Sequence, residues 1–397
     1  MADIRSYLKE KEKREQKLAE YKEKLAKNKR NILYRTLLIT AALAVLVIFI
    51  SIQFKYHIYT EYEIVASVER EAVGGALDMR LGNAILTYSK DGAHCTDARG
   101  NVKWNQTFEI QDIRMAVSGT TAAIGEYNGR NIYLADAEKL FGEIATAMPI
   151  QNLAVSQNGY VTAILNDTDV TWIYTYNSSG ELKYEGQAKM DNSGYPMAVG
   201  LSPNGELLCV SYVYLDAGVL KTNVAFYNFG SVGENVSDHL ISTFFYPDLV
   251  PYVGFLDDDT AFAVGDGRVM IYSGGRKPVV EMERLYDREI HSVFHSDRYV
   301  GLVFLSEDSE HRYRIDVYDA AASKMRSFYF DMDYTDIFFE KDTMVIYNET
   351  QCQIMTMDGI EKFNGSFSKP VRLMLPTGKA YRYLLVTDSS IDTIQLK

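Results

Sequence analysis

An uncharged apolar stretch near the N-terminus constrains this chain more than any other feature. Residues 36–52, TLLITAALAVLVIFISI, contain no charge and nothing more polar than Thr or Ser. A helix rises about 1.5 Å per residue, so this run alone is short of a hydrocarbon core of about 30 Å. Residues 32–54 are long enough if Arg35 extends its charge toward the headgroups. We therefore predict a transmembrane helix over residues 36–54 and a short linker over residues 55–61.

A cleaved signal peptide is the alternative interpretation of this stretch. Its charged leader would be unusually long and would contain acidic as well as basic side chains. No small-x-small cleavage site follows the apolar run, and the A-x-A sequence at residues 42–44 lies inside it. These features favour an uncleaved membrane anchor.

Charge is divided unequally across the predicted span. Residues 1–35 contain twelve of the 41 basic and six of the 53 acidic side chains, a net charge of +6, which leaves −18 on the rest of the chain. Short basic flanks stay on the cytoplasmic side of a membrane, so Lys29, Arg30 and Arg35 predict a cytoplasmic N-terminus and an exported C-terminal domain. The acidic exported domain argues against nucleic acid as a partner.

Neither the basic N-terminal segment nor the cysteines indicate a catalytic or metal-binding site. Residues 1–35 lack Gly and Pro, which predicts a cytosolic helix, either solvated, in a short coiled coil or lying on anionic lipid. Cys95, Cys209 and Cys352 are far apart and odd in number, so neither a disulfide framework nor a zinc site is indicated. This cysteine usage suits a bacterial envelope, although six N-x-S/T sequons would also suit a glycosylated secretory protein.

Turn signals recur at a regular spacing after residue 62. Short β-type runs end on Asp, Asn or Ser and are followed by small-residue turns. Successive marks are 39, 41, 51, 45, 46 and 39 residues apart, a mean of 43.5. That period fits four short strands with their turns, which is one blade of a β-propeller. The marks are Asp97, Asp136, Asn177, Asn228, Ser273, Asp319 and Asp358.

Two of these segments resemble the blades of known propeller families. Residues 97–104, DARGNVKW, contain Asp97, Gly100 and Trp104 and resemble the D-x-x-G-x-x-x-W turn of quinoprotein-type (PQQ-like) blades. Residues 201–208, LSPNGELL, resemble the S-P-D-G turn of WD40-like blades. Both resemblances imply a propeller fold, and neither assigns an activity.

Seven complete blades and two leftover segments account for residues 62–397. The strand predicted at residues 62–69 has no partner nearby, and residues 371–397 contain three strands. Pairing the two segments completes an eighth blade and removes the open edges of the ring. We therefore predict an all-β, eight-bladed β-propeller preceded by a single transmembrane helix and a short cytosolic helix, with seven blades as the alternative. The short linker would keep the propeller close to the membrane.

Candidate ligand-binding residues are few, and we predict no cofactor and no metal. His291 and His295 are four apart on a predicted strand, where their side chains would share one face, but no further ligand has a matching spacing. Asp257–Asp259 fits a solvated turn better than a calcium loop. One repeat position is aromatic, which predicts packing between blades: Tyr176, Tyr227, Tyr272 and Tyr318.

No catalytic motif emerges from the sequence. Quinoprotein dehydrogenases usually have an adjacent Cys-Cys pair, which is absent here, as are a P-loop, a nucleophile elbow and H-E-x-x-H. The order of basic helix, anchor and exported propeller resembles an uncharacterised family of membrane-anchored propeller proteins from Gram-positive bacteria. The predicted fold is also similar to the eight-bladed lipoprotein scaffold of outer-membrane barrel assembly. Both resemblances imply contacts with envelope proteins or the cell wall.

Three functions are consistent with these features. The first is a non-enzymatic extracytoplasmic binding or scaffolding protein of the cell envelope. The second is a membrane-tethered enzyme acting on polysaccharide or alcohol substrates at the mouth of the propeller channel, and the third is a single-pass envelope sensor. The channel lining discriminates between the first two: convergent carboxylates with an ion would favour chemistry, and small residues such as Ala116, Ala154 and Gly200 would favour a scaffold.

Overall fold

A computed structural model describes residues 2–168, 170–189, 193–307, 309–322 and 324–397. The chain divides into two compact units, Met1–Ile58 and Tyr59–Lys397. The first unit is an α-helix and the second is built from β-sheets.

One helix, α1, runs without interruption from Ala2 to Tyr56. It contains no Gly or Pro, so nothing in its sequence breaks the backbone hydrogen bonding. Within the described part of the chain, α1 is the one helix long and apolar enough to cross a membrane. Its apolar side chains are exposed, Leu38 by 70% for example, so no protein core covers them.

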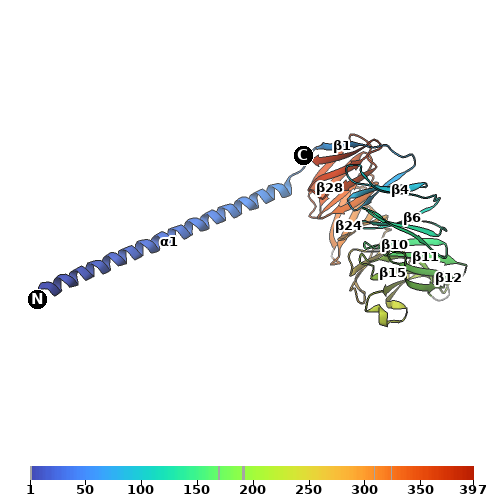
Figure 1. Ribbon diagram of the computed structural model, residues 1–397, viewed down its shortest axis with the longest axis horizontal. Helices are drawn as coiled ribbons and strands as arrows, with labels where there is room; N and C mark the ends of the chain where they lie inside the picture. Colours follow the sequence, from blue (N-terminus) through green and yellow to red (C-terminus); the bar gives the residue numbers. More distant parts are fainter. Residues whose placement is uncertain (1, 169, 190–192, 308, 323) are drawn as a thin grey trace. The chain divides into compact units, whose positions relative to one another are not determined.

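The second unit consists of eight four-stranded antiparallel sheets, which confirms the eight-bladed β-propeller and excludes the seven-bladed alternative (Figure 1). The first strand of each blade lies innermost, and the following strands lie progressively further out. Blades one to three contain β2 (Leu77–Leu81), β3 (Ala84–Ser89), β4 (Gly92–Thr96) and β5 (Val102–Thr107); β6 (Ile113–Ser118), β7 (Thr121–Glu126), β8 (Asn131–Asp136) and β9 (Leu140–Ala145); and β10 (Ile150–Val155), β11 (Val161–Asp167), β12 (Val170–Tyr176) and β13 (Leu182–Ala188).

The next four blades follow in chain order. Two short 3₁₀ turns, Gly233–Asn235 and Ser237–His239, separate the last two strands of blade four. Blades four to seven contain β14 (Tyr195–Leu201), β15 (Leu207–Asp216), β16 (Val219–Asn228) and β17 (Leu240–Tyr246); β18 (Tyr252–Phe255), β19 (Thr260–Gly265), β20 (Arg268–Ser273) and β21 (Val279–Leu285); β22 (Ser292–His295), β23 (Tyr299–Leu305), β24 (Tyr313–Asp319) and β25 (Lys324–Phe330); and β26 (Asp336–Glu340), β27 (Thr343–Tyr347), β28 (Gln351–Thr356) and β29 (Glu361–Ser366).

The eighth blade is built from both ends of the propeller sequence. It contains β30 (Leu373–Pro376), β31 (Arg382–Val386) and β32 (Ser390–Leu396), with β1 (Tyr62–Glu69) as its outermost strand. β1 pairs antiparallel with β32, and Figure 1 shows it beside the C-terminus. This pairing closes the ring with hydrogen bonds rather than with a covalent connection.

Hydrophobic packing occurs between neighbouring blades. Eight clusters of buried side chains fill the eight contacts between blades, which is why alternate residues of nearly every strand are apolar. Most clusters contain between nine and thirteen buried residues. The cluster between blades eight and one contains six: Ile85, Leu373, Leu375, Leu384, Val386 and Ile391. The closing contact therefore has the smallest apolar cluster among the described residues.

The strand order gives the propeller two distinct faces. The first face, here called the tether face, contains the turns between the first and second strands of each blade and the turns between the third and fourth strands. It also contains the start of β1 at Tyr62. On the second, the link face, lie the hairpins between second and third strands and the links from one blade to the next. In blade one, residues 82–83 and 97–101 belong to the tether face, and residues 90–91 and 108–112 belong to the link face.

Candidate functional site

The turn at Asp97 is held by its own side chain. One carboxylate oxygen accepts the backbone N–H groups of Arg99 at 2.8 Å and Asn101 at 2.9 Å. Burial alone would raise the pKa of Asp97, but the Asn101 side-chain amide, which donates to the other carboxylate oxygen at 2.9 Å, and these two backbone N–H groups outweigh it and lower the pKa below its usual value. Gly100 adopts a φ of 77°, which the turn requires and which glycine tolerates best. Trp104 is 7% exposed and donates its indole N–H to the Asp136 carbonyl at 2.6 Å, joining blade one to blade two.

Other turn marks form similar local bonds. The side-chain oxygens of Asp136, Asn177 and Asn228 each accept a backbone N–H two residues along. Asn228 also donates its amide to the Gly275 carbonyl of the next blade at 3.0 Å. The carbonyl of Asp319 accepts a backbone N–H three residues along, as that of Asp97 does. These residues stabilise turns and blade contacts.

Blade seven departs from the predicted spacing. Its turn begins at Thr356, whose hydroxyl accepts the N–H of Ile360 at 3.1 Å and whose carbonyl accepts the N–H of Gly359 at 2.8 Å. Asp358 lies two residues inside this turn and is not the equivalent of Asp97. The repeat pattern indicated Asp358 as the turn residue because it precedes a glycine. In the structure, the Thr356 hydroxyl accepts the hydrogen bond that caps the turn.

The repeated tyrosines lie between blades, as predicted. Tyr176, Tyr272 and Tyr318 are at most 7% exposed, and Tyr227 packs against the cluster between blades three and four. The hydroxyl groups of Tyr272 and Tyr246 are 2.8 Å apart, which satisfies both in the interior. Burial raises the pKa of Tyr176 to about 12, so its phenol is neutral at pH 7.

The two candidate histidines do not converge. His291 lies 6.3 Å from the ring of Tyr313, whereas His295 lies 5.2 Å from the ring of Phe262 in blade five. No group of three or more metal-ligating side chains occurs in the part of the chain that the structure describes. In the turn at residues 257–259, Asp257 accepts the Asp259 N–H at 2.9 Å, which is the geometry of a capped turn.

The three basic residues that predict membrane orientation all lie on α1. Lys29, Arg30 and Arg35 are exposed on the helix and precede or flank its apolar part. The structure places them on the same helix as the predicted span, and the orientation itself stays a prediction.

A channel of about 630 Å³ runs between the innermost strands. Small residues are part of its lining, among them Ala116, Ala154 and Gly200, and such residues are the ones expected in the lining of a scaffold. Its lining includes turn residues of the tether face, so it opens on that face. Five charged or titratable side chains also line it: Arg80, Tyr252, His295, Asp297 and Glu340.

Arg80 adds a positive charge to the channel wall, and His295 adds an imidazole. The Arg80 guanidinium carbon lies 5.4 Å from the centre of the Phe338 ring. Loss of hydration inside the channel and the positive charge of Arg80 both lower the pKa of His295, whose side chain stays accessible from the channel. In the sequence, His295 is marked by its spacing from His291, whereas no motif surrounds Arg80 and nothing there indicates its place in the channel.

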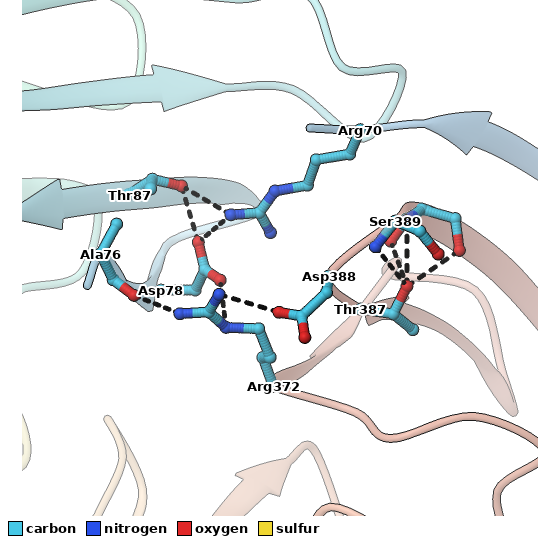
Figure 2. A network of polar contacts seen from close by, with 9 residues as sticks. Arg70, Ala76, Asp78, Thr87, Arg372, Thr387, Asp388 and Ser389 are labelled. Carbon is cyan, nitrogen blue, oxygen red and sulfur yellow. Dashed lines mark hydrogen bonds and ion pairs between the residues drawn. The ribbon is translucent and has the colours of Figure 1, made fainter. Parts of the chain in front are cut away.

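A buried ion network closes the contact between blades eight and one (Figure 2). Asp78 on β2 is fully buried and pairs with Arg70 at 2.5 Å and with Arg372 at 3.3 Å. The Thr87 hydroxyl donates to the same carboxylate at 2.7 Å, and Arg372 also pairs with the exposed Asp388 at 3.0 Å. Arg70 follows β1 and Arg372 precedes β30, so both ends of the propeller sequence are fixed to blade one. Two arginines and two aspartates make the network electrically neutral.

Blade four extends further than the other blades. β15 and β16 have ten residues each and form a hairpin that projects from the link face. The side chains of Leu215, Val219 and Leu220 at its tip are 61%, 56% and 47% exposed. Phe245 at the end of β17 is 66% exposed and lies 6.2 Å, edge-on, from the ring of Tyr214. In the sequence, the 51 residues between the turn marks Asn177 and Asn228 form the longest of the intervals, which indicates this extension.

The apolar tip has acidic surroundings. The link-face loops and adjoining strand ends of blades four to six contain ten acidic and five basic side chains among their described residues. The acidic ones are Asp216, Asp248, Asp266, Glu283, Asp287, Glu289, Glu307, Glu310, Asp331 and Asp333, and the basic ones are Lys221, Arg268, Arg284, Arg288 and Arg312.

Solved structures share this fold at low sequence identity. Sqt1 from Chaetomium thermophilum, solved bound to the N-terminus of the ribosomal protein L10, is 12% identical with a TM-score of 0.53, covering 85% of this chain and 100% of that one. BamB from Moraxella catarrhalis is 11% identical with a TM-score of 0.48, covering 85% of this chain and 98% of that one. At this identity the similarity to Sqt1 shows the propeller fold alone.

Sequence comparison assigns the family. No curated protein matches the chain significantly. A profile described as a family of unknown function, DUF5711, matches residues 55–396, which includes every strand of the propeller. The chain therefore belongs to the DUF5711 family.

Proposed function

We propose that this protein is a non-enzymatic binding or scaffolding protein of a bacterial cell envelope, anchored by α1 and exposing its propeller outside the cytoplasm. The apolar tip of the β15–β16 hairpin carries the proposal. Leu215, Val219, Leu220 and Phe245 place large apolar side chains in water on a closed, rigid scaffold. Such a cluster is typical of a surface that binds another protein.

The charged side chains around the hairpin tip indicate which charge a partner protein should carry. Acidic side chains outnumber basic ones on the link face of blades four to six, so a partner with basic flanks would be attracted and oriented there. Apolar anchors at the centre of an interface supply most of the affinity. We therefore expect a protein segment that offers apolar side chains flanked by Lys or Arg. Sqt1, which shares the fold, is bound to a protein N-terminus in its structure.

The anchor and the basic flank support the proposed location. Lys29, Arg30 and Arg35 would retain the N-terminal part of α1 in the cytoplasm and export the propeller. Cysteine labelling tests this orientation, because the three natural cysteines are buried and burial raises the pKa of Cys95 to about 12. They should not react while the protein is folded.

We expect a membrane-impermeant maleimide on intact cells to label Lys277→Cys on the propeller surface. Lys13→Cys on α1 should be labelled only after the membrane is permeabilised, and the unsubstituted protein should stay unlabelled throughout. The reverse pattern would place the propeller in the cytoplasm and overturn the proposed location.

Site-specific crosslinking tests partner binding on the link face. A photo-crosslinking amino acid is placed at Phe245 or Leu220 of the full-length protein in its native membrane. The control position is Val102 on the tether face, which is 61% exposed. We expect one adduct of defined mass from Phe245 and Leu220 and none from Val102.

The same experiment carries its own specificity controls. Adding Leu215→Asp should remove the Phe245 adduct, because a charge at the tip opposes apolar contact, and high salt should weaken it. No adduct at either position, an equal adduct at Val102, or an adduct that survives Leu215→Asp would overturn the proposed binding surface.

A further inference from the structure

The outermost strand of blade four differs from those of the other blades. Each outermost strand has one hydrogen-bonding edge without a neighbouring strand, and proteins usually protect such edges with charged side chains or proline. β17, with the sequence LISTFFY, contains neither. The outermost strands of the other seven blades all lie in the described chain and each contain at least one charged residue: β1, β5, β9, β13, β21, β25 and β29. The edge of β17 is therefore the least protected against pairing with a further strand.

The β15–β16 hairpin determines which backbone groups of β17 face this edge. Ala217 and Gly218 form a two-residue turn, so Asp216 and Val219 are a hydrogen-bonded pair. Hydrogen-bonded and non-hydrogen-bonded pairs alternate along an antiparallel ladder, and the register from this turn is unbroken. The N–H and C=O groups of Val224 therefore point away from β15 and toward β17.

This alternation leaves two residues of β17 with outward-facing backbone groups. Val224 pairs with Phe244, so Phe244 hydrogen-bonds to β16. Its neighbours Thr243 and Phe245 direct their N–H and C=O groups to the free edge, and the side chains of both are exposed. In the described chain, no backbone hydrogen bond joins Thr243 or Phe245 to a segment outside the sheet. The groups that a further strand needs are thus accessible.

Acidic side chains flank β17 at both ends. The loop before it, residues 229–239, contains Glu234 and Asp238, and residues 247–251 after it contain Asp248; neither segment contains Lys or Arg. Asp248 pairs with Arg268, whereas neither Glu234 nor Asp238 forms an ion pair among the described residues. A strand with an uncharged centre and basic flanks would complement this edge.

A second copy of this chain fits the edge less well. Antiparallel pairing of two β17 strands would place residues 229–239 of one copy beside residues 247–251 of the other. Acidic side chains would then lie next to acidic side chains, with no Lys or Arg in either segment. The net charge of −18 after residue 35 adds repulsion between two copies. A different protein with basic residues is the better partner.

We propose that the partner protein binds as an extended strand that pairs with β17 and enlarges the sheet of blade four. Its pairing segment is uncharged, rich in β-branched or aromatic residues, and flanked by Lys or Arg. Main-chain hydrogen bonds to Thr243 and Phe245 fix the register, and contacts with the apolar hairpin tip add affinity. This inference rests on the proposed function, since Phe245 belongs to both surfaces, and it specifies how the partner binds.

Proline substitution at the outer edge tests this pairing in the full-length protein in its native membrane. Thr243→Pro removes an outward-facing N–H and leaves the hydrogen bonds to β16 in place. The yield of the photo-crosslinked adduct from Phe245 should fall by roughly fivefold or more. Thr243→Val keeps the N–H and should retain the adduct. The midpoint of urea denaturation should be nearly the same for both variants.

Two further sets of variants test the edge and its charge separately. Phe245→Pro should remove the adduct formed from Leu220, whereas Phe245→Leu, which keeps the N–H and an apolar side chain, should retain it. Combining Glu234→Gln with Asp238→Asn should lower the adduct yield severalfold and weaken its dependence on salt. Glu109→Gln changes an exposed acid of blade one and should have no effect.

The outcomes distinguish the binding mode from the binding surface. If neither Phe245 nor Leu220 forms an adduct in the unsubstituted background, both the proposed function and strand pairing are wrong. An adduct that survives both proline substitutions, or that is lost equally with Thr243→Val and Phe245→Leu, would overturn strand pairing alone. A large fall in the urea midpoint of both proline variants would also overturn it, because these N–H groups would then be bonded within the blade.

Discussion

Asp78 holds together three segments that are remote in the sequence. Its carboxylate is fully buried between Arg70 and Arg372, which flank the two ends of the propeller sequence. A buried carboxylate depends on its partners: here Oδ1 accepts hydrogen bonds from Arg70 and the Thr87 hydroxyl, and Oδ2 lies 3.3 Å from the Arg372 guanidinium without a hydrogen bond. The polar network therefore reinforces the contact that has the fewest buried apolar side chains among those described.

We predict that Asp78→Asn destabilises the protein by about 3–5 kcal/mol, because it leaves Arg70 and Arg372 facing each other with the exposed Asp388 as their remaining counter-charge. Asp388→Asn is the matched control. Asp388 pairs with the same Arg372 but is 74% exposed, so its loss should cost no more than about 1 kcal/mol. Urea denaturation of the full-length protein measures both, and equal effects would show that burial of Asp78 does not govern its contribution.

The β15–β16 hairpin shows how one element can extend beyond a repeat without disturbing it. Its last two residue pairs, Leu215 with Leu220 and Asp216 with Val219, lie beyond the blade core and close on the turn residues Ala217 and Gly218. Both turn residues have positive φ, 50° and 83°, which is typical of the tight turn favoured in hairpins.

We predict that deleting residues 215–216 and 219–220 together removes partner binding and leaves stability within about 1 kcal/mol. The deletion shortens each strand by two residues, so the side-chain alternation and the native turn are both retained. Crosslinking from Phe245 and urea denaturation measure the two outcomes. A large loss of stability would indicate that the tip supports the blade and is not primarily a binding element.

The whole propeller is closed by one non-covalent strand pairing. The N–H of Arg70 donates to the Ser389 carbonyl at 3.0 Å, so the N–H of Val68, two residues earlier, also points toward β32. The N–H of Glu69 points to solvent. Opening this pairing would separate the first and last strands of the ring.

We predict that Val68→Pro speeds amide hydrogen exchange in blade eight and blade one while blade four exchanges as before. Glu69→Pro, on the solvent-facing position next to it, should have a much smaller effect. Exchange followed by mass spectrometry gives the pattern by peptide. Uniform acceleration in all eight blades would show that the ring opens as one cooperative unit.

The blade repeat could be predicted because its causes are local. The Asp97 carboxylate accepts hydrogen bonds from N–H groups no more than four residues away, and the strands of most blades are consecutive in the sequence. The turn residues and the alternation of apolar positions can therefore be recognised in the sequence. The prediction placed the start of the blade-seven turn at Asp358, because an Asp before Gly is typical of a turn. In the structure, the Thr356 hydroxyl accepts the backbone N–H that stabilises this turn. The predicted span could likewise be identified from length and composition.

The chain alone thus predicted an apolar helix, the blade period, the number of blades and the closing strand, all of which follow from periodicity, length and turn chemistry. Only the tertiary structure decided that Asp78 is shared by Arg70 and Arg372, and that Arg80 lines a channel together with residues of other blades. The physical reason is distance along the chain. A repeat pattern reflects hydrogen bonds and packing between residues that are close in the sequence. Ion pairs and the channel lining depend instead on which distant segments the closed ring brings together.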